Sequence, residues 1–361
     1  MRRCTFLLAV LLCTACTPGF DWLAPSGRSV PFNEGTAPPL PDADDPRFSV
    51  RPVFDAVPGK DASHAPTVAV FEDASLLAAW FSYTGPAELD GSAIFVARRP
   101  AGADAWTEPM LLVDSPAGDG NPVLYAEGDR VWLFFVRVPF GWATAQLSLM
   151  RSEDRGVTWT QPLALPVGIG TNIKFPPLRL PGGELLLPAY SDLVTRSLFL
   201  VSADDGASWT LRSTLYTPPP FECLQPSVAR LPGGRLLTVM RNRGQSFLWV
   251  AVSDDEGHTW TPPQDAGFDN PGSPAALLRL ASGALLLVLN DDPVSRRTLS
   301  ATLSRDDGRT WTPPRVIVTG AGAYSYPALA EGADGLVHLV YSHERQRIEH
   351  VELNAAWVAG E

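Results

Sequence analysis

A motif of eight residues returns along this chain at an almost constant spacing. It reads Ser-x-Asp-x-Gly-x-Thr/Ser-Trp, and its copies are SEDRGVTW (152–159), SADDGASW (202–209), SDDEGHTW (253–260) and SRDDGRTW (304–311). Their tryptophans lie 50, 51 and 51 residues apart, and a degraded copy ends at Trp106, 53 residues before Trp159. A constant period near fifty residues predicts a series of similar supersecondary units, each packed against its neighbours.

A second repeated element shows what each unit contains. Six short apolar segments each follow a Gly or Asp turn: 73–81, 128–136, 182–190, 233–241, 282–290 and 334–342. They are too short for helices and rich in β-forming residues, so they are predicted to be buried strands. Six all-strand units of about fifty residues predict an all-β fold, a six-bladed β-propeller. Residues 47–54 are expected to close the ring beside the last strand, near 347–353.

The aspartate of the motif is predicted to have a structural role. A carboxylate in this position can accept hydrogen bonds from its own turn, and the glycine allows a positive φ. Calcium needs several oxygen ligands around one ion, which one carboxylate per turn does not provide. Asp154, Asp204, Asp255 and Asp306 are therefore expected to cap turns at the edge of the propeller.

Charge and cysteine content restrict the partners and the chemistry. The net charge is −11 and the isoelectric point is near 5.0, so a nucleic-acid partner is not expected. Three of the four cysteines lie in the first 16 residues, which leaves Cys223 alone in the remainder. An intramolecular disulfide framework and a cysteine-based zinc site are therefore not expected. No cofactor is predicted.

The N-terminus is predicted to be that of an exported protein. MRRCTFLLAVLLCTAC has two arginines, a short apolar run and small residues, the pattern of a secretory signal. LCTAC resembles a bacterial lipobox, which makes residues 1–16 a lipoprotein signal and Cys16 the lipidated residue; ordinary signal cleavage is the alternative. The Pro- and Gly-rich residues 17–46 are predicted to tether the propeller to a bacterial membrane. The propeller would span residues 47–354, followed by a C-terminal tail, 355–361.

The repeated motif identifies a family resemblance. It is similar to the Asp-box, and tandem copies at this spacing resemble the sialidase superfamily of six-bladed propellers across residues 47–354. Asp-boxes also occur in non-enzymatic propellers, so they indicate fold more strongly than function. Sialidases of this type use three arginines to clamp a carboxylate, a tyrosine nucleophile, a glutamate that activates it and an aspartate acid/base. A neutral phenol suits a carboxylate-bearing sugar, because an anionic nucleophile would be repelled.

The resemblance assigns most of these roles to particular residues. FECLQPSVARLPGGRLLTVMRNR implies Glu222 as the activating glutamate and Arg241 as a clamp residue, with Arg243 as a nearby substitute. SRRTLSATLSRDDG implies Arg296 as a second clamp residue. AYSYPAL implies Tyr324 as the nucleophile, and Asp90 stands where the acid/base aspartate is expected.

The first clamp arginine has no counterpart. At its place the chain reads SHAP (63–66), so His64 replaces it, and a histidine cannot supply the bidentate fork of arginine. SHAP, NPVL (121–124), QPS (225–227), NPGS (270–273) and YSYPA (324–328) resemble a sialidase-like subgroup. Asn121 and Gln225 are expected to donate hydrogen bonds to sugar hydroxyls. Tyr326 follows Tyr324 on the same strand with one residue between them; the two are expected either to face the channel, where Tyr326 would bind substrate, or to be part of the core, and only the resemblance favours Tyr324.

These residues leave three functions open. The first is an exo-acting glycosidase that removes a carboxylate-bearing sugar, sialic or uronic acid, from a glycan terminus. The second is an exo-lyase in which His64 or Tyr324 takes the proton α to a uronate carboxylate. The third is a surface propeller that binds glycans without catalysis. The protein is expected to act as a monomer on an acidic glycan.

Basic residues near the C-terminus are predicted to be structural. Arg345 and Arg347 are expected to pair with Asp or Glu rather than with a ligand. His338, His343 and His350 lack the spacing of a convergent metal site, so no metal is predicted.

Overall fold

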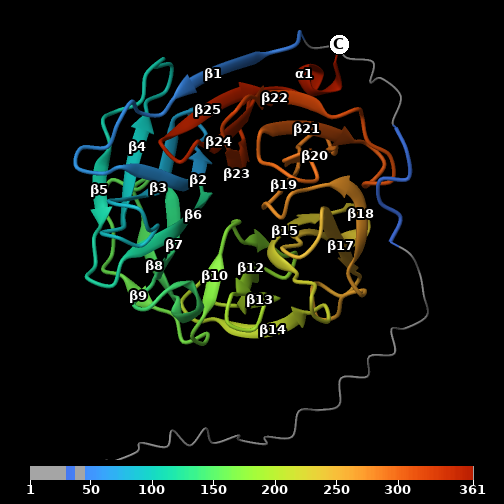
Figure 1. The fold of residues 1–361 in the computed structure, drawn as a ribbon, viewed down its shortest axis with the longest axis horizontal. Coiled ribbons are helices and arrows are strands. Elements are labelled where there is room, and N and C mark those ends of the chain that lie inside the picture. Colours follow the sequence, from blue (N-terminus) through green and yellow to red (C-terminus); the bar gives the residue numbers. More distant parts are fainter. Residues whose placement is uncertain (1–29, 37–44, 361) are drawn as a thin grey trace, which may run out of the picture.

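Six antiparallel sheets form a ring around a common axis in the computed structural model, which describes residues 30–36 and 45–360 (Figure 1). Five sheets have four strands and one has five. The predicted six-bladed β-propeller is therefore confirmed. The predicted signal and Cys16 lie outside the described residues, as does most of the predicted tether.

Each blade follows the chain from the axis to the rim. Blade 1 contains β2 (Ala62–Val70), β3 (Leu76–Tyr83), β4 (Ala93–Arg99) and β5 (Met110–Val113). Blade 2 contains β6 (Asp119–Glu127), β7 (Arg130–Arg137), β8 (Gln146–Ser152) and β9 (Leu163–Ala164). Blade 3 contains β10 (Thr171–Ile173), β11 (Leu178–Arg179), β12 (Leu185–Ser191), β13 (Arg196–Ser202) and β14 (Thr210–Leu215).

The second half of the ring repeats this order. Blade 4 contains β15 (Leu224–Arg230), β16 (Leu236–Arg241), β17 (Phe247–Ser253) and β18 (Gln264–Asp269). Blade 5 contains β19 (Ala276–Arg279), β20 (Leu285–Leu289), β21 (Thr298–Ser304) and β22 (Arg315–Thr319). Blade 6 contains β23 (Tyr324–Glu331), β24 (Val337–His343) and β25 (Arg347–Leu353).

The N-terminal strand completes blade 6. β1 (Phe48–Pro52) pairs antiparallel with β25, with Phe48 opposite Leu353 and Pro52 opposite Glu349. The first and last strands of the propeller thus share one sheet, and the predicted ring closure is confirmed.

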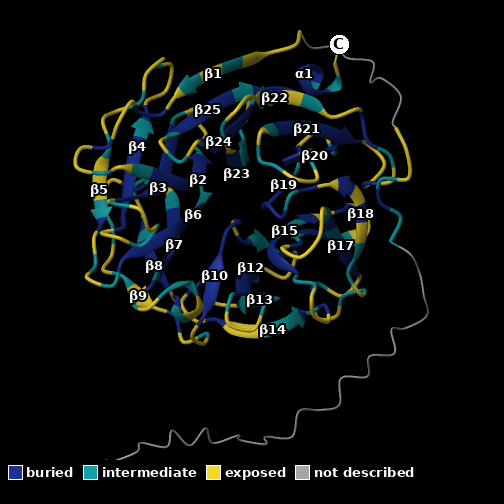
Figure 2. Ribbon diagram, in the orientation of Figure 1, coloured by how far each residue is buried: buried dark blue, intermediate teal, exposed yellow. Residues whose placement is uncertain are grey.

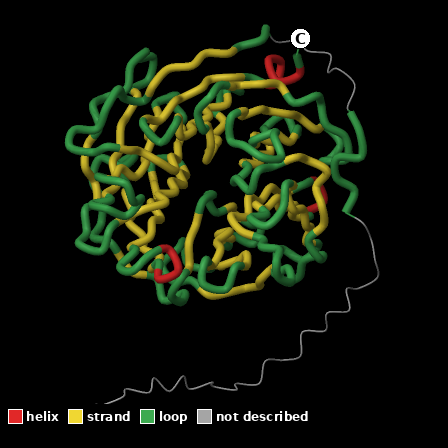
Figure 3. Tube along the Cα trace, viewed as in Figure 1, coloured by secondary structure: helices red, strands yellow, loops and turns green. Residues whose placement is uncertain are grey.

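Little of the described chain is helical (Figure 3). The helices are η1 (Trp142–Thr144), η2 (Pro232–Gly234) and α1 (Ala355–Ala359), and α1 falls within the predicted tail. The Asn354 side chain caps α1 by accepting a hydrogen bond from the Trp357 amide. Among the residues described, no helix has the length and apolar character needed to cross a membrane.

The hydrophobic core lies between blades rather than within them. Each of six apolar clusters joins side chains of two neighbouring blades, and together they run around the ring. The second strands of the blades are accordingly the most buried elements, while the outer strands are partly exposed (Figure 2). The Asp-box tryptophans belong to these clusters; Trp209 joins blades 2 and 3, and Trp311 joins blades 4 and 5. A single blade would leave these faces exposed, so the blades stabilise one another.

The Asp-box aspartates cap their own turns, as predicted. Asp154 accepts hydrogen bonds from the Thr158 amide at 2.8 Å and its hydroxyl at 2.6 Å, and from the Ser152 hydroxyl at 2.7 Å. The other three copies repeat these bonds. The bonds to Thr158 lower the pKa of Asp154 to about 2, which keeps it ionised.

A segment of the predicted tether docks on the ring. Residues 30–36 run along the Asp-box of blade 5, where the Asn33 and Glu34 amides donate to the carbonyls of Gly308 and Arg309 (Figure 1). Phe32 is buried between blades 4 and 5, with its ring 5.2 Å from that of Trp311. We call residues 30–36 the strap.

Candidate functional site

Four inner strands have the same irregularity near their first residues. Ala65, Asn121, Gln225 and Tyr326 each precede a proline and have φ between 47° and 61°. The strand register shifts at each of these positions. Left-handed backbone costs about 1–3 kcal/mol in a residue other than glycine, and a following proline disfavours it further. Such strain, repeated in four blades around one axis, marks a candidate site.

The same end of the blades supplies the loops that surround this site. Inner strands begin there, second strands end there, and the loops to the third strands lie there. Asp-boxes follow the third strands, so the antiparallel order places them at the opposite end. The site and the Asp-boxes therefore occupy the two opposite ends of the ring.

Tyr326 lies where residues of several blades meet. Its ring is 4.2 Å from the ring of His64 on β2 of blade 1. The Arg296 guanidinium, from the β20–β21 loop of blade 5, lies over it at 5.7 Å from the ring centre. The ammonium of Lys174, from blade 3, lies over the ring at 5.8 Å. Three other blades thus contribute to the surroundings of Tyr326.

His64 is a buried, neutral base beside this tyrosine. Its side chain is 1% exposed, and within the described structure neither ring nitrogen has a hydrogen-bond partner. Burial lowers its pKa well below the ordinary value, and the charges of Arg345 and Arg296 lower it further. The imidazole is therefore uncharged near neutral pH and keeps a free lone pair.

Three arginines surround the same point. The Arg241 guanidinium at the end of β16 donates to Gln225 Oε1 at 3.1 Å. Arg296 donates to the Gly272 carbonyl at 3.2 Å, and burial lowers its pKa. Arg345 forms an ion pair with Glu88, as predicted for an Asp or Glu partner, and Arg347 pairs with Glu349 at 2.6 Å. Arg345 nonetheless belongs to the site, because its carbonyl accepts a hydrogen bond from the Ser63 amide, next to His64, at 2.7 Å and its charge lowers the pKa of His64.

Besides Arg345, two polar groups of the site were not predicted from the sequence. The Lys174 ammonium is buried and donates to the Pro66 carbonyl at 3.0 Å, and burial lowers its pKa to about 7. The buried Tyr190 hydroxyl lies 3.4 Å from both Asn121 Nδ2 and Gln225 Nε2. A lysine in the apolar stretch NIKFPP was a usable signal, whereas nothing local distinguished Tyr190.

The other three predicted catalytic residues have no contact with Tyr326 in the described structure. Tyr324 packs in the apolar core between blades 5 and 6, 4.9 Å from the His343 ring. Glu222 pairs with Arg243 at 2.5 Å rather than with Arg241. Asp90 is exposed and accepts a hydrogen bond from the Ala87 amide of its own turn. Among the predicted residues, the structure brings together His64, Tyr326, Arg241, Arg296, Asn121 and Gln225.

The expectation about the C-terminal histidines was wrong in its geometry. His338 Nδ1 lies 3.1 Å from His350 Nε2 and 3.8 Å from Glu352, so these groups converge although the sequence spacing did not suggest it. They do so because β24 and β25 are adjacent in blade 6, where His338 lies opposite Glu352. Arg99 already binds the Glu352 carboxylate at 2.7 Å, which disfavours a cation at this position. The cluster therefore fits ring closure better than a metal site.

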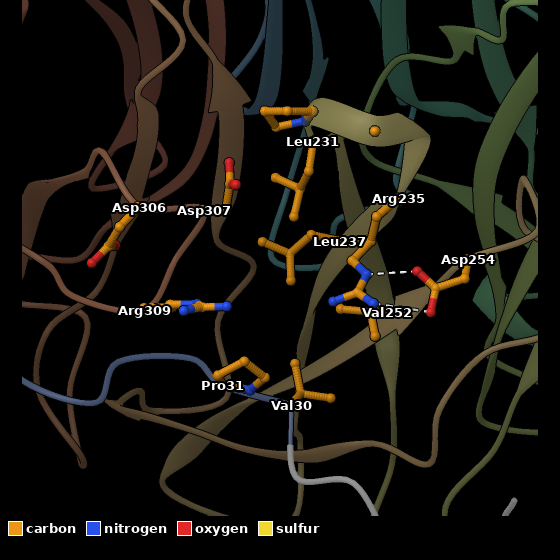
Figure 4. Close-up of a pocket in the computed structure, with 12 residues that line it drawn as sticks. Val30, Pro31, Leu231, Arg235, Leu237, Val252, Asp254, Asp306, Asp307 and Arg309 are labelled. Carbon is orange, nitrogen blue, oxygen red and sulfur yellow. Dashed lines mark hydrogen bonds and ion pairs between the residues drawn. The ribbon is translucent and has the colours of Figure 1, made fainter.

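A cavity at the opposite end is separate from the candidate site. Its volume is about 470 Å³, and the strap and the Asp-box of blade 5 form part of its wall (Figure 4). Arg235 in this wall is already paired with Asp254, at 2.6 Å. The candidate site at the strained inner strands therefore lies at the other end of the ring from this cavity.

Comparison with known proteins supports the architecture. The family described as "BNR repeat-like domain" matches residues 74–339. A sialidase of Bacteroides fragilis is 27% identical over 260 residues, covering 62% of this chain and 44% of the relative. A sialidase of Micromonospora viridifaciens is 31% identical over 142 residues, covering 36% and 21%. The chain thus spans less than half the length of these curated relatives.

Solved structures share the fold. A protein of unknown function from Dyadobacter fermentans superposes with a TM-score of 0.72 at 21% identity, covering 84% of this chain and 99% of that one. At this level of identity the likeness concerns the fold alone.

Proposed function

Because the chain belongs to the family of BNR repeat-like domains, within the sialidase superfamily, we propose that it is an exo-acting glycosidase that removes a carboxylate-bearing sugar from a glycan terminus. The observation that carries this proposal is the group of Arg241, Arg296 and Arg345 around Tyr326. Guanidinium forks bind carboxylates in two-pronged fashion, and a site with this much positive charge attracts an acidic sugar. Arg345 here takes the third clamp position, for which the sequence offered only His64.

In this mechanism Tyr326 is the nucleophile. Its hydroxyl oxygen attacks the anomeric carbon while His64, whose ring contacts that of Tyr326, accepts the phenol proton, and the bond from that carbon to the leaving oxygen breaks. Glu88 lies at the site through its pair with Arg345, whereas Asp90 is exposed. When the carboxylate of the sugar takes the place of Glu88 on Arg345, Glu88 is protonated and donates that proton to the leaving oxygen. Water then attacks the anomeric carbon and gives a proton to Glu88, while Tyr326 leaves the sugar and regains its proton from His64. Asn121 and Gln225 hold sugar hydroxyls.

A direct assay tests this proposal. The protein is incubated with sialyl-lactose and with a gum that carries terminal glucuronate, and the products are weighed by mass spectrometry. A released sugar that has gained one water supports hydrolysis. Retention of the glycan without any product would instead assign the site to binding alone.

One observation favours a second candidate, elimination. His64 is neutral, buried and in contact with Tyr326, which suits it to accept the proton α to a uronate carboxylate. The electron pair of that C–H bond would form the double bond as the glycosidic oxygen on C4 of a capped uronate leaves and takes the phenol proton of Tyr326, while the arginines neutralise the carboxylate. The product would carry an ultraviolet-absorbing unsaturated uronate and no added water. His64→Gln should then abolish its formation.

We also propose that the protein is exported and anchored to a bacterial membrane through lipid on Cys16. Support comes from the sequence LCTAC, with its cysteine at the end of an apolar run. Cys16→Ser should move the protein from the membrane fraction to the soluble fraction. An unchanged distribution, or a mature mass without lipid in the unaltered protein, would contradict the anchor.

A further inference from the structure

Lys174 is a buried cation with few partners. Its side chain is 2% exposed, and its one recorded hydrogen bond is to the Pro66 carbonyl at 3.0 Å. Among the ion pairs formed by residues 30–36 and 45–360, none includes Lys174. An ammonium has three donors, so two remain available for a ligand.

No group that the described structure places against Lys174 neutralises its charge. Tyr326 of β23 has its ring 5.8 Å from the ammonium, and Arg296 lies over that same ring. His64 of β2 contacts Tyr326 and is affected by the charge of Lys174, as well as by those of the three site arginines. A buried ammonium without an ion pair is costly unless a bound anion accompanies it.

We propose that Lys174 is a proton-linked part of the anion site: it gains a proton when an acidic sugar binds and loses it when the sugar leaves. This inference rests on the proposed function, since it requires the arginines to bind a carboxylate. The bound carboxylate supplies the negative charge that none of the described residues provides in an ion pair with Lys174. It therefore favours the ammonium over the amine, and ligand affinity falls as pH rises.

The pKa of Lys174 in the protein without ligand determines how many protons are taken up on binding. Burial lowers the pKa of Lys174 to about 7, so about one tenth of the side chains are neutral at pH 6 and about nine tenths at pH 8. Binding should take up more than about half a proton per ligand at pH 8 and about a tenth or less at pH 6. Affinity should fall about five- to tenfold between these pH values.

Isothermal titration calorimetry measures this directly. N-acetylneuraminic acid and glucuronic acid are each titrated into the protein at pH 6 and pH 8, in pairs of buffers with different ionisation enthalpies. The difference between buffers gives the number of protons taken up. Uptake at pH 8 that nearly vanishes at pH 6 is the expected result. Binding with no uptake at pH 8 would overturn the inference and leave the proposed function standing, whereas no binding of either acid would overturn both.

Variants test whether Lys174 is the group that takes up the proton when the ligand binds. Lys174→Met should abolish the uptake at pH 8, and Lys174→Arg, which keeps a permanent charge, should bind without uptake at both pH values. His64→Gln should keep the uptake; its loss there would assign the proton to His64 and overturn the inference. Lys60→Arg is the matched control, because Lys60 is the only other lysine of the chain and should leave the uptake unchanged.

Discussion

At the scale of single residues, Tyr324 and Tyr326 show how a bulge separates neighbours. Side chains two apart on a regular strand point to the same face. The register of β23 shifts between Ser325 and Ala328, and Tyr326 takes the left-handed conformation at φ 61°. This turn separates Tyr326, which joins the cations of the site, from Tyr324, which stays in the core between blades. The alternation of side chains along a strand therefore could not show which of the two tyrosines lies at the candidate site.

Replacing each tyrosine separately tests this distinction. Tyr326→Phe should lower kcat/KM for the acidic glycan by about 10³-fold or more, because the variant lacks the nucleophilic oxygen. Tyr324→Phe removes only one hydroxyl from the core and should keep activity within a few fold. The measurement is kcat/KM for both variants, with circular dichroism as the check on folding. Loss of activity in Tyr324→Phe alone would return the nucleophile to Tyr324.

At the scale of the element, the repeat predicted the blades well. The tryptophan spacing and the six apolar segments correspond to six sheets because each blade is local in sequence and repeats the same turn. The strap was not predicted. Composition marked residues 17–46 as a linker, and Phe32 gave no periodic signal, yet its ring packs between blades and backbone hydrogen bonds hold the strap beside it. Three site residues were not predicted for a related reason: Lys174, Tyr190 and Arg345. Contacts between blades depend on how the propeller closes, which the sequence of one blade does not show.

The strap should contribute measurably to stability. Phe32 fills a space beside Gly308, where a Cβ atom would come within 2.8 Å of its ring, so the two surfaces fit closely. Phe32→Ala should lower the free energy of unfolding by about 3 kcal/mol, because it leaves a cavity between blades 4 and 5. Urea denaturation measures this change. The exposed Val294→Ala serves as the control and should stay within about 0.5 kcal/mol. An unchanged stability in Phe32→Ala would mean that the strap is not held by this ring.

At the scale of the whole molecule, the propeller is closed where the N-terminal strand β1 pairs with β25, a junction that we call the seam. β1 meets β25 there, and the Glu352 carboxylate connects Arg51 of β1 with Arg99 of blade 1. His338 and His350 lie buried beside it, with their rings 5.3 Å apart. Burial lowers the pKa of His338 to about 4 and that of His350 well below its ordinary value, and Arg99 adds to both effects. The surroundings of the seam therefore favour the neutral form of both imidazoles.

Acid should weaken this seam. Above about pH 6.5 both histidines are neutral in the folded and the unfolded protein, so they contribute no pH dependence to the free energy of unfolding. Between pH 6.5 and about 4 the unfolded chain binds protons that the folded protein excludes, so stability falls as pH falls. His338 alone should account for a loss of about 3 kcal/mol across this range. Urea denaturation at a series of pH values measures the slope.

A pair of variants separates the seam from other acid effects. His338→Gln removes one group that takes up a proton on unfolding. The free energy of unfolding of this variant should therefore fall less steeply between pH 6.5 and 4 than that of the unaltered protein, and the two slopes should differ by the contribution of about one proton. His258→Gln is the control, because His258 is exposed on the Asp-box of blade 4 and should leave the slope unchanged. An equal slope in all three proteins would show that His338 is protonated in the folded ring. The seam would then tolerate charge, and acid stability would have to depend on other groups, such as the site histidine His64, which burial and the surrounding cations also keep neutral.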